Sequence, residues 1–253
     1  MLELYHSGLT TCSKQIRLVL REKGLDYESR YVELWNYANL NKEYLKINEV
    51  GVVPTLVHDG VPIRNSFVIA EYIEDVFSEP SLLPSTALAR AKMRLWTWTA
   101  DDIHLAATAV TYNANLQNMV DELSEEDKQI MLEATPVPDR RARWQKLADG
   151  GIDQRELDGA LDKINWGLER FDEAIGDGPW VCGDEYSLAD IMMLSIVHRT
   201  RELAPELVTP EVCPRVVAWQ ERMMARSAVE YVYKPGTDET PKRPSGKSIS
   251  GIA

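Results

Sequence analysis

The sequence has few cysteines, few histidines and no long apolar run. Its three cysteines and four histidines stand far apart, without the spacing of a metal site or of a disulfide framework. No run approaches the ~20 apolar residues of a membrane-spanning helix. Met1 is followed by strand-like sequence rather than by a basic and then an apolar leader segment. We therefore expect a cytoplasmic protein with no metal and no membrane partner.

Positive charge is also scarce. The chain has 40 Asp and Glu residues against 28 Lys and Arg residues, which gives a net charge of −12. A nucleic-acid partner requires lysines and arginines that neutralise phosphates, and no basic patch with interleaved aromatic residues is present. This balance excludes a nucleic-acid partner. The length of 253 residues fits one large or two modest domains.

The most informative stretch lies near the N-terminus. Leu2–Tyr5 alternates as a strand does, and a helix is expected to begin near Thr11 and to end at Gly24. The N-terminus of a helix stabilises an anion, so the Cys12 thiol could ionise there with the Ser13 hydroxyl as a hydrogen-bond donor. The same residues are also typical of an ordinary helix cap with a small buried cysteine. Both interpretations stay open at this point.

The first eighty residues predict a small sheet with flanking helices. Strands are expected at 27–34, 53–58 and 61–63, the last two joined at Asp59-Gly60, and helices at 42–47 and 67–77. The order strand, helix, strand, followed by strand, strand, helix is a thioredoxin-like arrangement. Tyr5 falls within the first strand and is interpreted as a core residue.

Strand patterns stop at a segment rich in proline and serine, 79–85, which predicts a domain boundary. Beyond it we expect helices at 86–117, 124–133, 139–148, 153–175 and 214–226. The tail is rich in Pro, Gly, Ser and Lys and is expected to be extended or disordered. The predicted organisation is a thioredoxin-like α/β domain at 1–78, a linker at 79–85, an all-α domain at 86–232 and a tail at 233–253.

Two further motifs complete a resemblance to a known family. With the Cys12-Ser13 turn, Val53-Pro54 and Asn65-Ser66 make the N-terminal region resemble the glutathione transferase superfamily. The resemblance implies glutathione as co-substrate and a cis bond at Val53-Pro54, which lets the Val53 backbone pair with the cysteinyl part of glutathione. It also implies that Ser66 holds the γ-glutamyl carboxylate at a helix N-terminus.

The chain departs from the family pattern at two of these positions. Asn65 replaces the usual Asp or Glu that meets the α-ammonium group of glutathione, and Val52 replaces a Gln or Lys. Asn39 is our candidate for the contact with the glycine carboxylate. The segment 180–190 is similar to the C-terminal signature of the same superfamily, in which Asp190 and Ser187 form a capping box. We interpret Asp190 as structural, and Cys182 as a packing residue.

Three functions follow from the resemblance. The first is a transferase in which glutathione thiolate, held by Ser13, attacks an apolar and aromatic electrophile. Segments at 93–98 and 135–144 are similar to the sphingomonad glutathione-dependent β-aryl-etherases, which extends this function to ether cleavage. The second is a thiol oxidoreductase in which Cys12 forms a mixed disulfide with glutathione. The Cys12-Ser13 pair resembles the Cys-Ser pair of the bacterial beta class. The third is a non-catalytic glutathione-binding protein.

Two expectations concern the helical domain. Trp98, Asp101, His104 and Tyr112 could share a helix face directed at the thiol, or could simply pack against other helices. A homodimer is expected because the superfamily usually pairs, and because Phe77, Met93 and Trp96 would otherwise leave an apolar surface near the linker.

Overall fold

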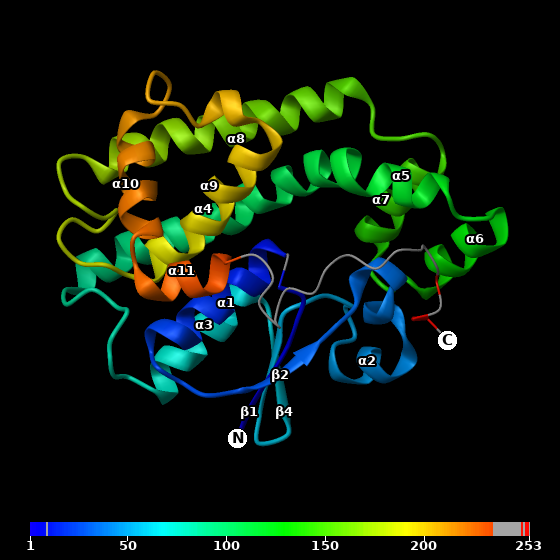
Figure 1. The fold of residues 1–253 in the computed structure, drawn as a ribbon, viewed down its shortest axis with the longest axis horizontal. Coiled ribbons are helices and arrows are strands. Elements are labelled where there is room, and N and C mark those ends of the chain that lie inside the picture. Colours follow the sequence, from blue (N-terminus) through cyan, green and yellow to red (C-terminus); the bar gives the residue numbers. More distant parts are fainter. Residues whose placement is uncertain (9, 235–248, 250, 253) are drawn as a thin grey trace.

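The computed structural model describes residues 1–8, 10–234, 249 and 251–252. A four-stranded mixed sheet forms the lower part of the molecule in Figure 1. Its strands, in the order β2-β1-β3-β4, are β1 Leu2–His6, β2 Glu28–Tyr31, β3 Thr55–His58 and β4 Val61–Arg64. β1 pairs with β2 in parallel, as the crossover through a helix requires, and with β3 in antiparallel orientation.

Three helices complete the N-terminal domain: α1 Thr11–Glu22, α2 Lys42–Ile47 and α3 Ser66–Val76. The apolar side chains of α1 face inward, because they recur at helical spacing and are fully buried at Ile16, Val19 and Leu20. α1 and α3 lie between the strands and the helices of the second domain (Figure 1). The predicted thioredoxin-like arrangement is confirmed.

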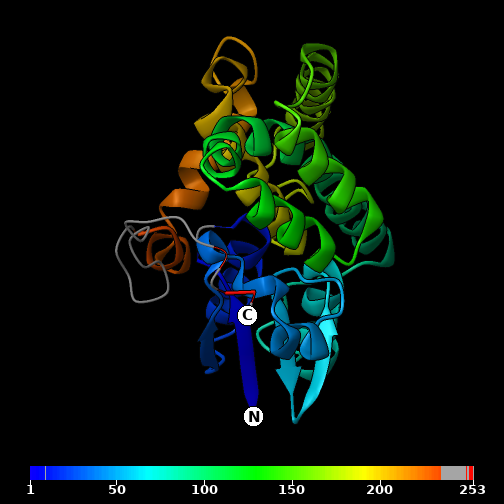
Figure 2. The same ribbon diagram turned by 90° about the vertical axis from the view of Figure 1, so that its right-hand side faces the viewer.

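The second domain consists of helices stacked above the sheet (Figure 2). They are α4 Ala87–Thr111, α5 Gln117–Asp121, α6 Glu125–Ala134, α7 Pro138–Ala148, α8 Gln154–Ile175, α9 Leu188–Leu203, α10 Pro214–Met224 and α11 Ser227–Tyr233. Among the described residues of this domain the only β pairing is two isolated bridges between 180 and 185. The predicted all-α class of this domain is therefore confirmed, while the domain boundaries stay a prediction.

Several element limits differ from the sequence prediction. β2 ends at Tyr31 rather than at 34, because the Glu33 carboxylate accepts the Trp35 N–H at 3.0 Å and starts a 3-10 turn. The helix expected at 86–117 is interrupted by a π-helical turn, Tyr112–Leu116, which separates α4 from α5. α11 has no counterpart among the helices predicted from the sequence. The predicted tail lies mostly outside the described residues.

The main core joins both domains around α4, α8 and α9. Trp96 packs edge-on against Phe171 at 5.0 Å between ring centroids, and Phe171 packs against Trp219 at 4.9 Å. Met93 is fully buried and Trp96 is 7% exposed. The expectation that Met93 and Trp96 leave an apolar surface near the linker is therefore wrong, because the chain buries both within its own core.

Asp190 stabilises the start of α9. Its carboxylate accepts hydrogen bonds from Val181 N–H at 3.1 Å, Ser187 N–H at 3.0 Å and Trp219 Nε1–H at 2.9 Å. Burial raises the pKa of Asp190, although these donors and the Ser187 hydroxyl act in the opposite direction. The structural role predicted for Asp190 is confirmed, since its acceptor capacity is used within the fold.

No helix among the described residues has the length and apolar character needed to cross a membrane. The same residues contain no cluster of three or more His, Cys, Asp or Glu side chains arranged to hold a metal ion.

Candidate functional site

The first turn of α1 brings Cys12 and Ser13 to different environments. Thr10 is the N-cap: its hydroxyl oxygen accepts the Ser13 N–H at 3.4 Å. The Ser13 side chain is fully buried, and its hydroxyl oxygen accepts hydrogen bonds from the Thr10 hydroxyl at 2.7 Å and the Ser7 N–H at 3.3 Å. The Ser13 hydroxyl is thus engaged inside the turn.

Cys12 instead faces a small pocket between the two domains. Side chains from α1, α3, α4 and α9 line it: Cys12, Gln15, Ser66, Phe67, Thr97, Asp101, His104 and Met192. Ser13 lies outside this set. Of the two residues predicted at the turn, the structure brings only Cys12 to the pocket.

His104 is the immediate neighbour of the Cys12 sulfur. Nε2 of His104 lies 3.5 Å from Sγ of Cys12. Burial alone would raise the pKa of the Cys12 thiol, but the positive charge of the imidazole and the hydrogen bonds from His104 and Ser66 outweigh it, so the pKa of Cys12 is lowered. Burial likewise opposes the charge on His104, yet the adjacent thiolate raises the pKa of His104. The two groups therefore favour a thiolate and imidazolium pair.

Helical spacing explains which residues of α4 reach this pocket. Thr97, Asp101 and His104 follow one another at intervals of four and three residues and therefore share a face of the helix. Trp98 belongs to a different face and is 63% exposed. Tyr112 packs against Trp144 at 4.8 Å between ring centroids. Of the four residues that could have faced the thiol, only Asp101 and His104 line the pocket.

Ser66 and Asn65 lie where α3 begins. Ser66 is the first residue of α3 and lines the pocket beside Cys12. Asn65 has a φ of 69°, a conformation that asparagine tolerates better than most residues, and its side-chain oxygen accepts the N–H groups of Phe67 and Val68. Asn65 therefore caps the helix and brings no negative charge. Asp101 is the only carboxylate among the residues that line the pocket.

The loop before β3 contains Val52, Val53 and Pro54, and Asn39 reaches it from a 3-10 turn, Ala38–Leu40. The Val53-Pro54 bond is cis, as predicted. The side chain of Asn39 donates from Nδ2 to the Gly51 carbonyl at 2.9 Å. The carbonyl of Val52 accepts a hydrogen bond from Asn48 Nδ2 at 2.8 Å. These contacts hold the loop in place. The side chain of Val52 is apolar and offers no hydrogen bond.

Some residues at the site gave no signal in the sequence. Gln15 donates from Nε2 to the Met192 carbonyl at 3.1 Å and so joins α1 to α9 below Cys12. Arg140 of α7 donates to the loop before Val53-Pro54, and Arg143 lies near enough to His104 to lower its pKa. Both arginines belong to a polar helix face, and nothing in the local pattern distinguishes that face from a solvated one.

Tyr5, interpreted from the sequence as a core residue, lies outside the set of residues that line the pocket. It is partly buried in β1, and its ring lies 6.0 Å from that of Tyr44. This position agrees with the interpretation of Tyr5 as a residue that packs in the core.

Comparison with known proteins adds two family matches and full-length relatives. Residues 11–76 match the model of the glutathione S-transferase N-terminal domain, and residues 130–227 match that of the C-terminal domain. Protein LigF of Sphingobium sp. (strain NBRC 103272 / SYK-6) is 30% identical over 94% of this chain and 95% of its own length. The tetrachloro-p-hydroquinone reductive dehalogenase of Sphingobium chlorophenolicum is 26% identical over 90% of this chain and 93% of its own length.

A solved structure resembles the whole fold. The crystal structure of the β-etherase LigF from Sphingobium sp. strain SYK-6 has a TM-score of 0.87 at 29% identity, covering 92% of this chain and 98% of its own. The family matches lie in the two domains that meet at the Cys12 pocket. The chain belongs to the glutathione S-transferase family.

Proposed function

We propose that this chain is a glutathione-dependent enzyme in which the Cys12 thiolate exchanges with glutathionyl disulfides. The observation that carries the proposal is the pairing of Cys12 with His104 at 3.5 Å in the pocket, with the pKa of the thiol lowered. Thiol–disulfide exchange requires a thiolate as nucleophile. Ser13, which the sequence favoured for holding a glutathione thiolate, is fully buried and lies outside the set of residues that line the pocket.

The reaction has two balanced steps. Cys12 thiolate attacks the glutathionyl sulfur of a mixed disulfide, the S–S bond breaks, and the departing thiolate takes a proton from His104. A second glutathione then gives its thiol proton to His104 and, as thiolate, attacks the Cys12 mixed disulfide, which releases oxidised glutathione and restores the Cys12 thiolate beside the His104 imidazolium. All three cysteines lie among the described residues and are free, so a second glutathione is the resolving thiol.

Glutathione is expected to bind where the family motifs meet the pocket. We propose that Ser66 and the N–H groups at the start of α3 hold the γ-glutamyl carboxylate. The Val53 backbone before Pro54 would pair with the cysteinyl residue, and Asn39, Val52 and Asn65 would shape the surroundings. Asn65 carries no negative charge, so Asp101 would supply the carboxylate that meets the α-ammonium group of glutathione.

Cleavage of aromatic ethers is a second candidate function, favoured by the full-length similarity to LigF. Here a glutathione thiolate would attack the carbon that carries the ether oxygen, the C–O bond would break, and the phenolate would take a proton from His104. The apolar side chains of Phe67 and Met192 in the pocket fit an aromatic acceptor.

Intact-mass spectrometry separates the two candidates. After incubation with oxidised glutathione, we expect one glutathionyl adduct, on Cys12. Cys182 and Cys213 serve as internal controls, because burial raises the pKa of Cys182 and raises that of Cys213 to about 11. Turnover of an aryl ether without any adduct on Cys12, and without turnover of glutathionyl disulfides, would contradict the exchange reaction and support the second candidate.

We also propose a homodimer, on different residues from those the sequence indicated. The apolar residues Leu95 and Trp98 of α4 are 58% and 63% exposed, and Val68 of α3 is 50% exposed. These side chains lie on two helices that pack against each other, and exposed apolar side chains that gather on one face are typical of a protein interface. Light scattering should give twice the mass of one chain for the wild type. Trp98→Glu should shift the protein toward the monomer, whereas a wild type of single-chain mass would refute the dimer.

A further inference from the structure

Arg140 connects the helical domain to the loop before Val53-Pro54. From α7, its Nη1 donates to the carbonyls of Val50 at 3.2 Å and Gly51 at 3.3 Å. The Gly51 carbonyl also accepts the Asn39 side chain. The segment from α5 to α7 lies above the part of the N-terminal domain that holds α2 (Figure 1; Figure 2). A cation thus lies beside Asn39, the residue proposed from the sequence as the contact for the glycine carboxylate of glutathione.

Among the residues that the structure describes, Arg140 has no carboxylate partner. Within the part of the chain that the structure describes, neither Arg140 nor its neighbour Arg143 forms an ion pair, and the Arg143 guanidinium lies 5.4 Å from the centroid of the Tyr112 ring. Elsewhere on α7, Lys146 pairs with Glu156. Burial lowers the pKa of Arg140, and the positive charge of Arg143 acts in the same direction. An anion that reached Arg140 would therefore compensate both burial and repulsion.

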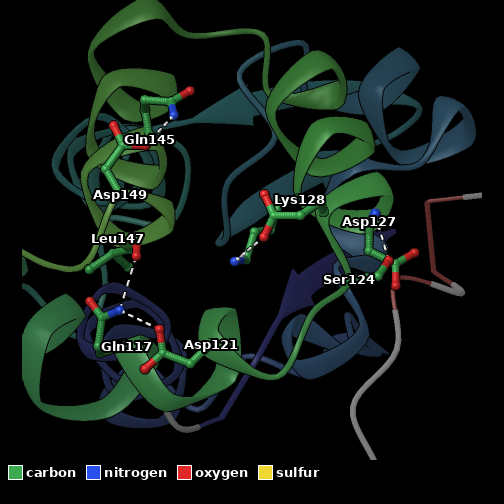
Figure 3. A network of polar contacts seen from close by, with 9 residues as sticks. Gln117, Asp121, Ser124, Asp127, Lys128, Gln145, Leu147 and Asp149 are labelled. Carbon is green, nitrogen blue, oxygen red and sulfur yellow. Dashed lines mark hydrogen bonds and ion pairs between the residues drawn. The ribbon is translucent and has the colours of Figure 1, made fainter.

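The helix that carries Arg140, α7, contacts both α5 and the N-terminal domain. Gln117 of α5 donates from Nε2 to the Leu147 carbonyl of α7 at 3.0 Å and to Asp121 at 2.7 Å (Figure 3). Tyr37 of the N-terminal domain packs against Trp144 of α7 at 5.7 Å between ring centroids. Arg140 is thus held over the loop by packing on both sides of α7.

The order of the proposed glutathione contacts places its glycine end near this arginine. The γ-glutamyl part would lie at Ser66 and the cysteinyl part at Val53, so the remaining carboxylate extends to the other side of Val53. One extended residue spans roughly 3.3–3.6 Å, and Gly51 is two positions before Val53. Val52 has no polar side chain, and the Asn39 amide is already hydrogen-bonded.

We propose that Arg140 binds the glycine carboxylate of glutathione and supplies the contact that Val52 cannot. The proposal rests on the proposed function only in that glutathione binds at Val53 and Ser66. Nη1 retains its hydrogen bonds to the loop carbonyls, while Nη2 and Nε donate to the carboxylate. Arginine binds a carboxylate most strongly through two such parallel hydrogen bonds. The helical domain then recognises the end of the tripeptide that the thioredoxin-like domain leaves unpaired.

Binding of two peptides under reducing conditions tests the proposal. Calorimetry compares glutathione with γ-glutamylcysteine, which lacks the glycine. We expect the wild type to bind glutathione at least tenfold more tightly. Arg140→Gln should lose that preference, because its affinity for glutathione falls about tenfold while its affinity for γ-glutamylcysteine stays the same. Arg140→Lys should recover part of the preference. Arg141→Gln is the matched control, because the Arg141 guanidinium donates to the Thr135 carbonyl within its own domain, and it should keep the full preference.

Other outcomes would overturn it. If Arg140→Gln weakens both peptides equally, Arg140 acts only by holding the loop. If the wild type binds both peptides with the same affinity, the glycine carboxylate contributes nothing to binding and Arg140 does not bind it. Calorimetry does not depend on turnover, so glutathione binding with the expected preference, but without an adduct on Cys12, would refute the exchange reaction and support the role of Arg140.

Discussion

Cys12→Ser is expected to reduce the exchange of glutathionyl disulfides by about 10³-fold or more, which corresponds to about 4 kcal/mol of transition-state stabilisation. A serine hydroxyl remains protonated beside His104, so the nucleophile is lost while the volume of the side chain is nearly kept. Steady-state turnover of a glutathionyl mixed disulfide measures the loss. Circular dichroism checks that the variant is folded.

Ser13→Ala is the matched comparison at the adjacent residue. Removal of its hydroxyl leaves the buried Ser7 N–H without its acceptor, whereas the Thr10 hydroxyl still donates to the Ser7 carbonyl at 3.0 Å, so we expect a stability cost of about 1–2 kcal/mol. Turnover of the disulfide should fall by less than about tenfold. The reverse order, with Ser13→Ala inactive and Cys12→Ser mild, would exclude Cys12 as the nucleophile and restore the sequence-based assignment to Ser13.

The pH dependence of the Cys12 reaction should depend on His104. Because the thiolate is the reactive form, the rate of alkylation by iodoacetamide falls as pH falls through the pKa of the thiol. The lowered pKa of Cys12 moves this fall to a lower pH than for an ordinary thiol. In His104→Gln the imidazolium charge is absent while burial remains, so the pKa of Cys12 should rise and the profile should move to higher pH. An unchanged profile would contradict the pairing.

Asp190→Ala is expected to reduce the free energy of unfolding by about 3–5 kcal/mol. The variant leaves the buried donors Val181 N–H, Ser187 N–H and Trp219 Nε1–H without an acceptor. It also removes the reciprocal half of the capping box at the start of α9. Equilibrium unfolding in urea measures the change.

Asp184→Ala is the control for this substitution. Asp184 lies in the same turn but is exposed, so its removal should change stability by less than about 0.5 kcal/mol. A loss of similar size in both variants would mean that the turn tolerates no substitution and that the carboxylate of Asp190 has no special part. A loss confined to Asp190→Ala supports its role as the acceptor that joins the turn, α9 and α10.

The sequence by itself determined the elements that depend on neighbouring residues. Asp59-Gly60 predicted the hairpin, because both residues adopt positive φ and allow a tight turn. Ser124 predicted the start of α6, since its hydroxyl oxygen accepts the Asp127 N–H at 3.1 Å. Gly24 follows α1 with a φ of 63°. Such interactions span a few residues, so their signals are present in the sequence before folding.

The tertiary structure decided which side chains meet at the site. Cys12 and Ser13 are adjacent on α1 and point in directions about 100° apart, so only the packing of α1 against α4 and α9 determines that Cys12 faces the pocket and Ser13 the interior. His104 lies 92 residues from Cys12, and Arg140 lies 89 residues from Gly51. These contacts arise because burial of apolar helix faces fixes the orientation of the two domains. No local pattern carries that orientation, which is why the sequence named both Cys12 and Ser13 and could not decide which of them faces the pocket.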